Sequence, residues 1–395
     1  MPRIFLYNPT CEMATRNMSV SYQPPERLSE FERNIASILM FLAEEGDYVV
    51  AGEPDAQLIT FWQSRGKAIP TFCDTARAAQ LIASGCELQA WGESPQLFHS
   101  LLLTEQLHAF GAARRKLFSR LTSVAIETAI ARQPLPEYAR IGTLPTIITD
   151  AKILESITAN EPRALKSLWS ASGRGVVLVR KAQHVAPAVV WARGILRRDG
   201  AIVSEPFLRR VAEFSLLFVK QADGGVEYLG KNVFRTDVAG RFGAEVIDND
   251  YFTEKVRQWN IPADWEAAVV PLIADAIESC SDIASYAGPI GLDAMFYADG
   301  DTVKLRCCTE ANLRLSMGNV NMSVARYFSR TATAEWKIEQ FATPAEWQEF
   351  CRRMEREHPA RCDANGLIKS GFFRLTGIGC GERFGAYGFA VDANR

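Results

Sequence analysis

The chain has 395 residues, 48% of them hydrophobic, which is enough for two or three domains with substantial cores. Its formal net charge is −2, with acidic and basic residues interspersed, so a nucleic-acid partner is not indicated. No apolar run approaches the ~18 residues that would span a bilayer, and we expect no membrane partner.

The N-terminus and the cysteines bear on the cellular compartment. The opening MPRIFLYNP reads as a first strand rather than a secretory signal. Nine cysteines are present without a CxxC pair, which is typical of reduced thiols in a cytosolic protein. The four histidines show no metal-ligand spacing, so a zinc site is not expected. We therefore expect a cytoplasmic protein.

Strands and helices alternate over the first hundred residues. Ser29 and Glu32 form a candidate capping box before an apolar helical stripe over residues 31–42. Residues 58–61 fit a strand or a helix equally well, and a helical pattern starts at Thr75. The expected strands are residues 2–7, 48–50 and 68–72. This alternation predicts a small α/β domain over residues 1–100.

A connecting region is expected over residues 101–145. Leu101 to Arg132 carry a long helical pattern, and residues 134–145 contain three prolines and read as a linker. A new region starts near Thr146, where Asp150 is a candidate N-cap of a helix that contains Lys152.

A Ser/Gly-rich loop follows, between two expected strands. Residues 164–169 and 176–179 read as the strands, and residues 170–175 as the loop. Small residues let backbone N–H groups approach phosphate oxygens, while Ser170 and Ser172 add hydroxyl donors. Because a strand follows the loop, it is a hairpin rather than a P-loop. An ordinary turn remains the alternative for the loop taken alone.

Further strands and helices are expected up to residue 395. The helices are expected over residues 262–286 and in a C-terminal segment capped by Thr343 and Glu346. The strands are expected at residues 200–207 and in a hairpin of 213–220 with 226–234. The chain ends in a Gly- and aromatic-rich stretch with strand character.

The most informative segment is residues 288–318, GPIGLDAMFYADGDTVKLRCCTEANLRLSMG. A short Asp/Gly turn around Gly300 predicts a hairpin that brings Asp293 near Glu310 and Asn312. Two carboxylates and an amide oxygen are hard ligands of the kind that Mg²⁺ uses beside nucleotide phosphates. Arg314 follows on the same face and can grip a phosphate or carboxylate.

The order of these segments resembles the ATP-grasp superfamily, in which two lobes hold ATP between them. The resemblance covers residues 146–325, about half of the chain. The matching stretches are Lys152, ALKSLWSASGRGV (164–176), VSEPFLRRVAEFSLLF (203–218), GLDAMF (291–296) and EANLRLSMG (310–318). It implies an α+β ATP-grasp fold preceded by a small Rossmann-like α/β domain, with ATP and Mg²⁺ (or Mn²⁺) as cofactors.

The resemblance also implies domain limits. The ATP-grasp core would span residues 146–330, with a lid lobe over 146–203 and a metal-binding lobe over 204–330. Residues 331–395 would form a C-terminal α+β extension.

The resemblance implies a role for each matching residue. Lys152 and Lys166 are similar to the phosphate-contacting lysines, and Asp293, Glu310 and Asn312 to the Mg²⁺ ligands. Arg314, Lys166 and Arg174 would be the catalytic cations. The expected lid residues are Ser172, Gly173, Arg174 and Gly175. The expected adenine and ribose contacts are Glu205, the backbone near Phe207 and Leu208, and Glu213. Taken singly, Lys152 and Glu213 also fit ordinary surface charges.

The implied activity is an ATP-dependent carboxylate–amine ligase that works through an acyl phosphate, on a small-molecule or peptide carboxylate and an amine acceptor. A kinase of the same fold and a nucleotide-binding module without turnover are the alternatives, and a homo-oligomer is compatible with the sequence. Asn8, Glu12, Arg16 and Arg241 are substrate-binding candidates, with loop solvation or capping as the alternative. Lys231 and Arg235 fit a phosphate or substrate contact and a structural ion pair equally well.

Overall fold

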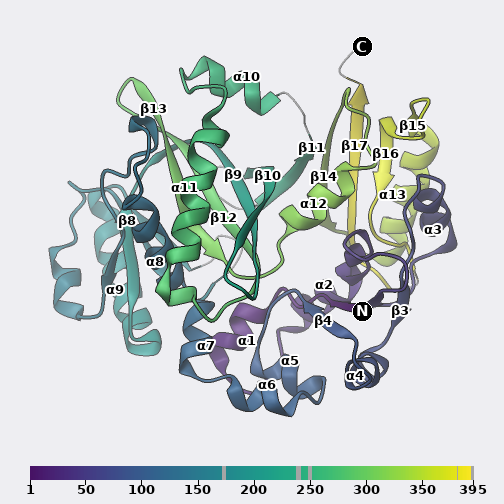
Figure 1. Ribbon diagram of the computed structural model, residues 1–395, viewed down its shortest axis with the longest axis horizontal. Helices are drawn as coiled ribbons and strands as arrows, with labels where there is room; N and C mark the ends of the chain where they lie inside the picture. Colours follow the sequence, from purple (N-terminus) through teal and green to yellow (C-terminus); the bar gives the residue numbers. More distant parts are fainter. Residues whose placement is uncertain (171–174, 237–241, 248–250, 380, 393–395) are drawn as a thin grey trace.

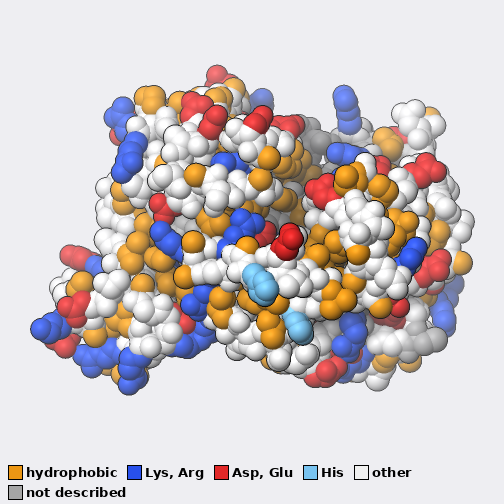
Figure 2. All heavy atoms as spheres, turned by 60° about the horizontal axis from the view of Figure 1, so that its bottom comes forward, with side chains coloured by type: hydrophobic (Ala, Val, Ile, Leu, Met, Phe, Trp, Pro, Cys, Tyr) orange, Lys and Arg blue, Asp and Glu red, His pale blue; other side chains and the backbone are white. Residues whose placement is uncertain are grey.

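The computed structural model describes residues 1–170, 175–236, 242–247, 251–379 and 381–392. Three sheets organise the chain (Figure 1): a four-stranded parallel sheet, a four-stranded antiparallel sheet and a large nine-stranded sheet. Within the described residues no helix has the length and apolarity needed to cross a membrane. On the face shown in Figure 2, positive and negative side chains are interspersed.

The parallel sheet has the order β3-β2-β1-β4 and confirms the α/β start of the chain. Its strands are β1 (Arg3–Leu6), β2 (Tyr48–Val50), β3 (Thr71–Cys73) and β4 (Glu87–Ala90). Its helices are α1 (Cys11–Asn17), α2 (Glu26–Ile35), η1 (Ala36–Phe41), α3 (Ala56–Gln63), α4 (Thr75–Ala83) and α5 (Pro95–Ser100). The ambiguous residues 58–61 are helical, because Asp55 caps α3 by accepting from the Leu58 N–H.

The predicted capping box at Ser29 is wrong. Helix α2 begins three residues earlier, directly after Pro25, so Ser29 lies inside the helix. Pro25 is the N-cap residue, with an extended ψ of 141°, and the helix starts at the next residue. Glu32 instead accepts hydrogen bonds from the backbone N–H and hydroxyl of Thr10, at 2.9 and 2.7 Å. Glu32 therefore ties α2 to the start of α1.

The long helix expected over residues 101–132 is also wrong. The segment forms three helices, α6 (Thr104–Ala109), α7 (Ala112–Leu117) and α8 (Arg120–Ala131). Gly111 separates the first two, and Ser119 caps the third by accepting from the Leu121 N–H at 3.3 Å. The helical periodicity continues across these breaks because apolar side chains of all three helices pack against a core: Leu107 of α6 is partly buried, and Leu117 of α7 and Ile126 of α8 are buried.

The small antiparallel sheet has the order β5-β8-β6-β7. Its strands are β5 (Thr146–Ile148), β6 (Arg163–Ser167), β7 (Val176–Val179) and β8 (Ile202–Pro206). Asp150 caps the following turn as expected, but the turn is the 3₁₀ helix η3 (Ala151–Ser156). Helix α9 (Ala182–Asp199) was not expected, and it packs Ala188, Ala192 and Ile195 into the core of this sheet. Another 3₁₀ turn, η2 (Glu137–Ala139), precedes the sheet.

The large sheet has the order β13-β12-β9-β10-β11-β14-β17-β16-β15. Its first half comprises β9 (Arg209–Lys220), β10 (Val226–Thr236), β11 (Phe242–Ile247), β12 (Gly288–Asp299) and β13 (Thr302–Asn312). Both predicted hairpins are confirmed, with Val226 opposite Lys220 and Thr302 opposite Asp299. Helices α10 (Tyr251–Gln258), α11 (Trp265–Ser279) and α12 (Met317–Ala325) complete this part. The helix expected over 262–286 ends at Ser279, because Cys280 is extended before the 3₁₀ turn η4 (Ser281–Ile283).

The C-terminal segment completes the same large sheet. It contains β14 (Ala332–Gln340), α13 (Pro344–Glu357), β15 (Arg361–Cys362), β16 (Ile368–Arg374) and β17 (Phe384–Asp392). Thr343 caps α13 as predicted, accepting from the Glu346 N–H at 3.2 Å. These strands lie beside the first residues of the chain (Figure 1), where Arg374 pairs with Asp55 and the Trp62 indole donates to the Arg374 carbonyl. The first and last segments therefore share one apolar core.

Candidate functional site

Asp293, Glu310 and Asn312 meet at one edge of the large sheet. Strands β12 and β13 pair Asp293 with Glu310 and Gly291 with Asn312, as the turn at Gly300 predicted. Asn312 Nδ2 donates to Asp293 Oδ2 at 3.3 Å. From the neighbouring strand β9, Ser215 Oγ donates to Asp293 Oδ1 at 2.7 Å. The sequence therefore predicted this oxygen-rich cluster correctly, apart from Ser215.

The electrostatics of the cluster suit a divalent cation. Burial and the nearby Glu310 carboxylate raise the pKa of Asp293 to about 7. A cation would relieve this repulsion, and carboxylate and amide oxygens are ligands that Mg²⁺ accepts. Within the described residues, no three His, Cys, Asp or Glu side chains are placed to hold a metal ion together. The candidate donor set at this sheet edge is the carboxylates of Asp293 and Glu310 and the amide oxygen of Asn312.

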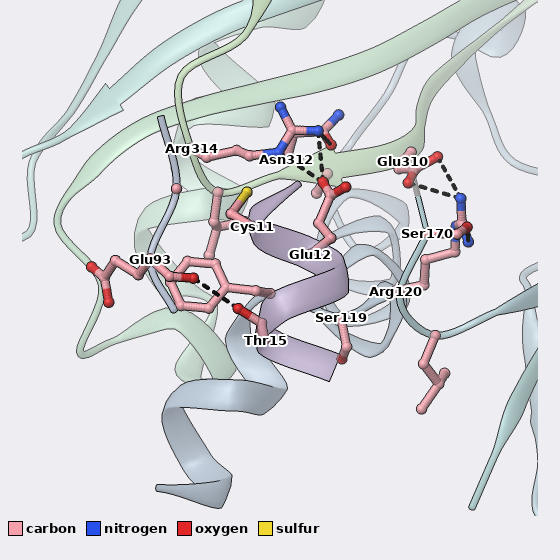
Figure 3. A pocket seen from close by; sticks show the side chains of 15 residues that line it. Cys11, Glu12, Thr15, Glu93, Ser119, Arg120, Ser170, Glu310, Asn312 and Arg314 are labelled. Atoms are coloured by element: carbon pink, nitrogen blue, oxygen red, sulfur yellow. Dashed lines mark hydrogen bonds and ion pairs between the residues drawn. The ribbon is translucent and has the colours of Figure 1, made fainter. Parts of the chain in front are cut away.

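Arg314 connects this cluster to the first α/β unit (Figure 3). Its Nε and Nη2 both lie 2.7 Å from Glu12 Oε1, and Nη2 also donates to Asn312 Oδ1 at 3.1 Å. Glu12 lies on α1, about three hundred positions from Arg314 in the sequence. The structure thus brings a predicted substrate residue and a predicted catalytic cation into one ion pair.

Arg120 is a site residue that the sequence did not reveal. It opens α8 and is 4% exposed. Its Nη1 donates to the Ser167 carbonyl and to Ser170 Oγ, both at 2.6 Å. Its Nη2 lies 3.0 Å from Glu310 Oε1 and 3.2 Å from Oε2. No local pattern marks this arginine, because its partners are 47 to 190 positions away.

Lys166 and Glu205 belong to a second buried cluster. Lys166 Nζ lies 2.5 Å from Glu205 Oε1, and Arg306 Nη2 lies 2.9 Å from Glu205 Oε2. Arg306 also makes two contacts with Glu127, at 2.7 and 2.9 Å. Burial alone would raise the pKa of Glu205, but Lys166 and Arg306 hold it below its usual value. Sequence reasoning missed Arg306 and Glu127.

The other residues expected to contact the nucleotide lie outside the Lys166–Glu205 cluster. The Phe207 N–H donates to the Pro162 carbonyl at 2.9 Å, and the Arg180 guanidinium lies 5.1 Å from the Phe207 ring centroid. Leu208 follows directly, before β9 begins. Glu213 accepts from Arg210 and Thr236, both at 2.6 Å. Lys152 is exposed on η3.

The Ser/Gly loop is described only at its ends. Gly175 has φ of +64°, and a Cβ there would lie 2.3 Å from Ser167 Oγ, so the position requires glycine. Ser172, Gly173, Arg174 and also Arg241 lie outside the described residues.

Several candidates have structural partners. Asn8 exchanges hydrogen bonds with the Gly92 backbone at 2.8 and 3.1 Å. Arg16 pairs with Asp199 at 3.2 Å and Arg235 with Glu335 at 2.7 Å. Lys231 pairs with Glu266 and lies over the Phe252 and Trp265 rings. Each of these residues therefore has a packing or pairing role.

A polar network lies on the large sheet beyond Ser215, around a cavity of about 190 Å³. Asn232 Nδ2 donates to Glu245 Oε2 at 2.7 Å, and Asn321 Nδ2 donates to Asn232 Oδ1 at 2.7 Å. The Trp336 indole donates to Asn321 Oδ1 at 2.7 Å. Burial raises the pKa of Glu245 to about 8, although Asn232 donates to it. Glu245 is therefore a buried acid that holds its proton at neutral pH.

Comparisons with known proteins identify the fold. No protein-family model matches the chain, and no curated protein matches it. Among solved structures, N5-carboxyaminoimidazole synthetase from Staphylococcus aureus aligns with a TM-score of 0.50 and 12% identity, over 100% of this chain and 93% of that one. Biotin carboxylase from Campylobacter jejuni gives 0.50 and 12%, over 99% and 87%. Pyruvate carboxylase from Rhizobium etli gives 0.53 and 14%, over 100% and 36%.

The chain has the ATP-grasp fold, as its motifs implied. Its small parallel sheet fits the Rossmann-like domain expected before the ATP-grasp core, and the whole is α+β. At 12% to 14% identity, the feature shared with these proteins is the fold.

Proposed function

We propose that the protein is an ATP-dependent carboxylate–amine ligase. A substrate carboxylate oxygen attacks the γ-phosphorus of ATP, the bond to the β-phosphate oxygen breaks, and ADP leaves with that electron pair. An amine then attacks the acyl phosphate carbon, phosphate leaves, and the nitrogen loses protons to phosphate and solvent. The observation that carries this proposal is the convergence of Asp293, Asn312, Glu310 and Arg314 at one sheet edge.

The structural neighbours support the reaction class. The Staphylococcus aureus protein is described as a synthetase, and the Campylobacter jejuni protein as a biotin carboxylase in an ATP complex. Both share the fold over nearly the whole chain. Acyl-phosphate chemistry also needs no protein nucleophile, because positioning and charge neutralisation supply the catalysis.

We assign Asp293, Glu310 and Asn312 to Mg²⁺ or Mn²⁺, which would neutralise phosphate charge when bound. Arg314 would orient the acyl phosphate as a bidentate donor. Lys152, Lys166 and the loop residues Ser172, Gly173, Arg174 and Gly175 would hold the phosphates. Glu205, Phe207, Leu208 and Glu213 would surround the adenosine.

The ion pairs are compatible with these roles. Lys166 is bound to Glu205, and Arg120 to Glu310, so Lys166 and Glu310 each have a partner of opposite charge. If Lys166 moves to a phosphate, Glu205 keeps Arg306, and no buried carboxylate is left alone. If a metal takes Glu310, Arg120 keeps Ser167 and Ser170.

We further propose the domain limits 1–100, 101–145, 146–203, 204–330 and 331–395. The small antiparallel sheet supports the lid lobe, because β5, β6 and β7 lie within residues 146–203 and β8 (Ile202–Pro206) crosses the limit between the two lobes. The C-terminal strands add to the large sheet, so the last segment would extend the metal-binding lobe. We place the protein in the cytoplasm.

The experiment measures ADP, free phosphate and products by mass spectrometry, with Mg–ATP and a panel of acids and amines. We expect ADP and phosphate in equal amounts with an amide product. ADP without phosphate, and a phosphorylated product stable to hydroxylamine, would make the protein a kinase. ATP binding without turnover under any condition would make it a binding module. Either outcome overturns the ligase.

Lys166→Ala tests the nucleotide contact within the same assay. We expect weaker ATP binding, because the variant removes a cation from the phosphates. Lys304→Ala is the matched control, since Lys304 pairs with Asp299 at the far end of the β12–β13 hairpin. Unchanged ATP affinity in Lys166→Ala would contradict the assignment.

A further inference from the structure

Four buried charged residues form one connected cluster that joins the small antiparallel sheet to the large sheet. They come from α8, β13, β8 and β6 and are 2% to 9% exposed: Glu127, Arg306, Glu205 and Lys166. Their two positive and two negative charges cancel. Replacing a whole buried ion cluster by apolar side chains often costs no stability, so stability alone does not account for this arrangement.

The hydrogen bonds within the cluster follow one order. Arg306 donates twice to Glu127, from Nε to Oε1 at 2.7 Å and from Nη2 to Oε2 at 2.9 Å. The same Nη2 donates to Glu205 Oε2 at 2.9 Å, and the other oxygen, Glu205 Oε1, lies 2.5 Å from Lys166 Nζ. In the described part of the chain, neither Glu127 nor Arg306 hydrogen-bonds to Lys166. Their hydrogen bonds therefore reach Lys166 only through Glu205.

The Lys166 ammonium lies between this cluster and the metal hairpin. Its Nζ donates to the Thr309 carbonyl at 3.2 Å, and Thr309 directly precedes the candidate metal ligand Glu310. The function proposed above assigns Lys166 to the nucleotide phosphates. The direction in which Glu205 holds the ammonium therefore matters for nucleotide binding.

We infer that Arg306 and Glu127 are positioning residues for nucleotide binding. Glu127 orients the Arg306 guanidinium, Arg306 fixes the Glu205 carboxylate, and Glu205 holds the Lys166 ammonium. The terminal torsion of a glutamate is broad, so a carboxylate held at one oxygen alone is poorly oriented. Displacement of a binding group by about 1 Å can cost about 10²-fold in activity. The inference rests on the proposed function at one point, which is the contact of Lys166 with phosphate.

The charge states of the two acids agree with this order. Burial raises the pKa of Glu127, although Arg306 donates to it twice. Burial acts on Glu205 in the same direction, but Lys166 and Arg306 outweigh it and lower the pKa of Glu205. Glu205 is therefore the more firmly ionised acid, and it keeps the negative charge that holds Lys166.

The test is a double-mutant cycle on the nucleotide affinity of the full-length protein. Calorimetry measures the dissociation constants of Mg–AMP-PNP and of adenosine for wild type, Glu127→Gln, Lys166→Ala and the double variant. We expect Glu127→Gln to weaken AMP-PNP binding about fivefold when Lys166 is present, on the scale of coupling between contacting residues, and to have no effect when Lys166 is alanine. Adenosine carries no phosphate, so Glu127→Gln should leave its affinity unchanged.

Other outcomes would overturn the inference. Equal weakening of AMP-PNP binding in both backgrounds, or equal weakening for AMP-PNP and adenosine, would reveal a merely structural role for Glu127. Unchanged AMP-PNP affinity in Glu127→Gln would show that Glu127 does not act on Lys166. Failure of the wild type to bind AMP-PNP would remove the binding that the two residues are inferred to support.

Arg306→Lys repeats the cycle at the second residue. Lysine keeps the charge but lacks the guanidinium fork that reaches both acids, so we expect a loss of AMP-PNP affinity that again depends on Lys166. Glu355→Gln is the matched control, because Arg374 likewise joins Glu355 to a second carboxylate, Asp55. This control should leave AMP-PNP affinity unchanged. A comparable loss in Glu355→Gln would contradict the inference.

The cycle also separates this inference from the ligase proposal. If acids and amines drive release of ADP and phosphate but the effect of Glu127→Gln does not depend on Lys166, the inference falls and the ligase stands. If the effect depends on Lys166 but no acid and amine stimulate ATP turnover, the ligase falls and the positioning role stands.

Discussion

Glu205 and Asp293 are acids on strands that face the same region of the molecule, yet their surroundings differ. Glu205 has a cation on each carboxylate oxygen, Lys166 and Arg306, and its pKa lies below the usual value. Among the described residues, the hydrogen-bond donors to Asp293 are a hydroxyl and an amide, and its pKa rises to about 7. The first cluster is neutralised by the protein itself. In the second cluster Arg120 pairs with Glu310, and the Asp293 carboxylate is left for an external cation to neutralise.

The largest effect is expected from Arg306→Met. This change leaves Glu127 and Glu205 with one cation between them, in a buried site. We expect the free energy of unfolding to fall by about 3–5 kcal/mol, as for a broken buried pair. Urea denaturation measures it. A loss below about 1 kcal/mol, the value of an exposed pair, would remove the distinction between the two clusters.

Asp293→Asn should lower turnover and leave stability unchanged, in contrast to Arg306→Met. We expect turnover to fall at least ~10²-fold, on the scale of one lost transition-state charge contact. Stability without added metal should not fall, because the change removes repulsion with Glu310. Stabilisation of the protein by Mn²⁺ should disappear, whereas Asp299→Asn at the other end of the hairpin should retain it. Near wild-type turnover in Asp293→Asn would exclude its metal role.

Glu245→Gln tests whether a buried acid without a cationic partner has a raised pKa, as Asp293 does. The measurement is the pH dependence of stability. The pKa of Glu245 rises from 4.5 to about 8 on folding, so between these values the folded protein binds one proton more than the unfolded chain. Stability contributed by this group is therefore lost as pH rises through that window, by up to about 1.4 kcal/mol per pH unit. Denaturation at pH 5, 6, 7 and 8 should give a steeper decline for wild type than for the variant. Parallel curves would contradict the shift.

Thr343→Ala should have the smallest effect on stability. Because Thr343 lies outside both clusters, this variant is a control for the effect of stability on turnover. Loss of the α13 cap should cost about 1 kcal/mol of stability. Turnover should not change, since the cap lies on the C-terminal segment. A fall in turnover comparable to that of Asp293→Asn would mean that activity follows global stability rather than the metal edge.

The sequence predicted the metal hairpin because its information is local. Asp293, Glu310, Asn312 and Arg314 lie within one 31-residue stretch, and the Asp/Gly turn sets their register. The ATP-grasp fold followed from the order of such stretches. Arg120 and Arg306 could not be found this way, because tertiary packing brings them together with partners that are 47 to 190 positions away.

Helix boundaries failed for a related reason. The apolar period over residues 101–132 continues through Gly111 and Ser119, and only the geometry of the packed chain reveals the breaks. The start of α2 was decided by Pro25 rather than by the better-known Ser/Glu pattern four residues later. Helix α9 contains Pro187, which obscured an otherwise regular pattern.

The shared core of the first and last segments has a consequence for biosynthesis. Ile35, Ile38 and Leu39 are completely buried in a core that also contains Trp336 and Phe384, about three hundred residues later. At roughly 5–20 residues per second, a ribosome needs about 15–60 seconds to supply those partners. The apolar face of the emerging N-terminal segment therefore stays exposed until those later residues have been synthesised.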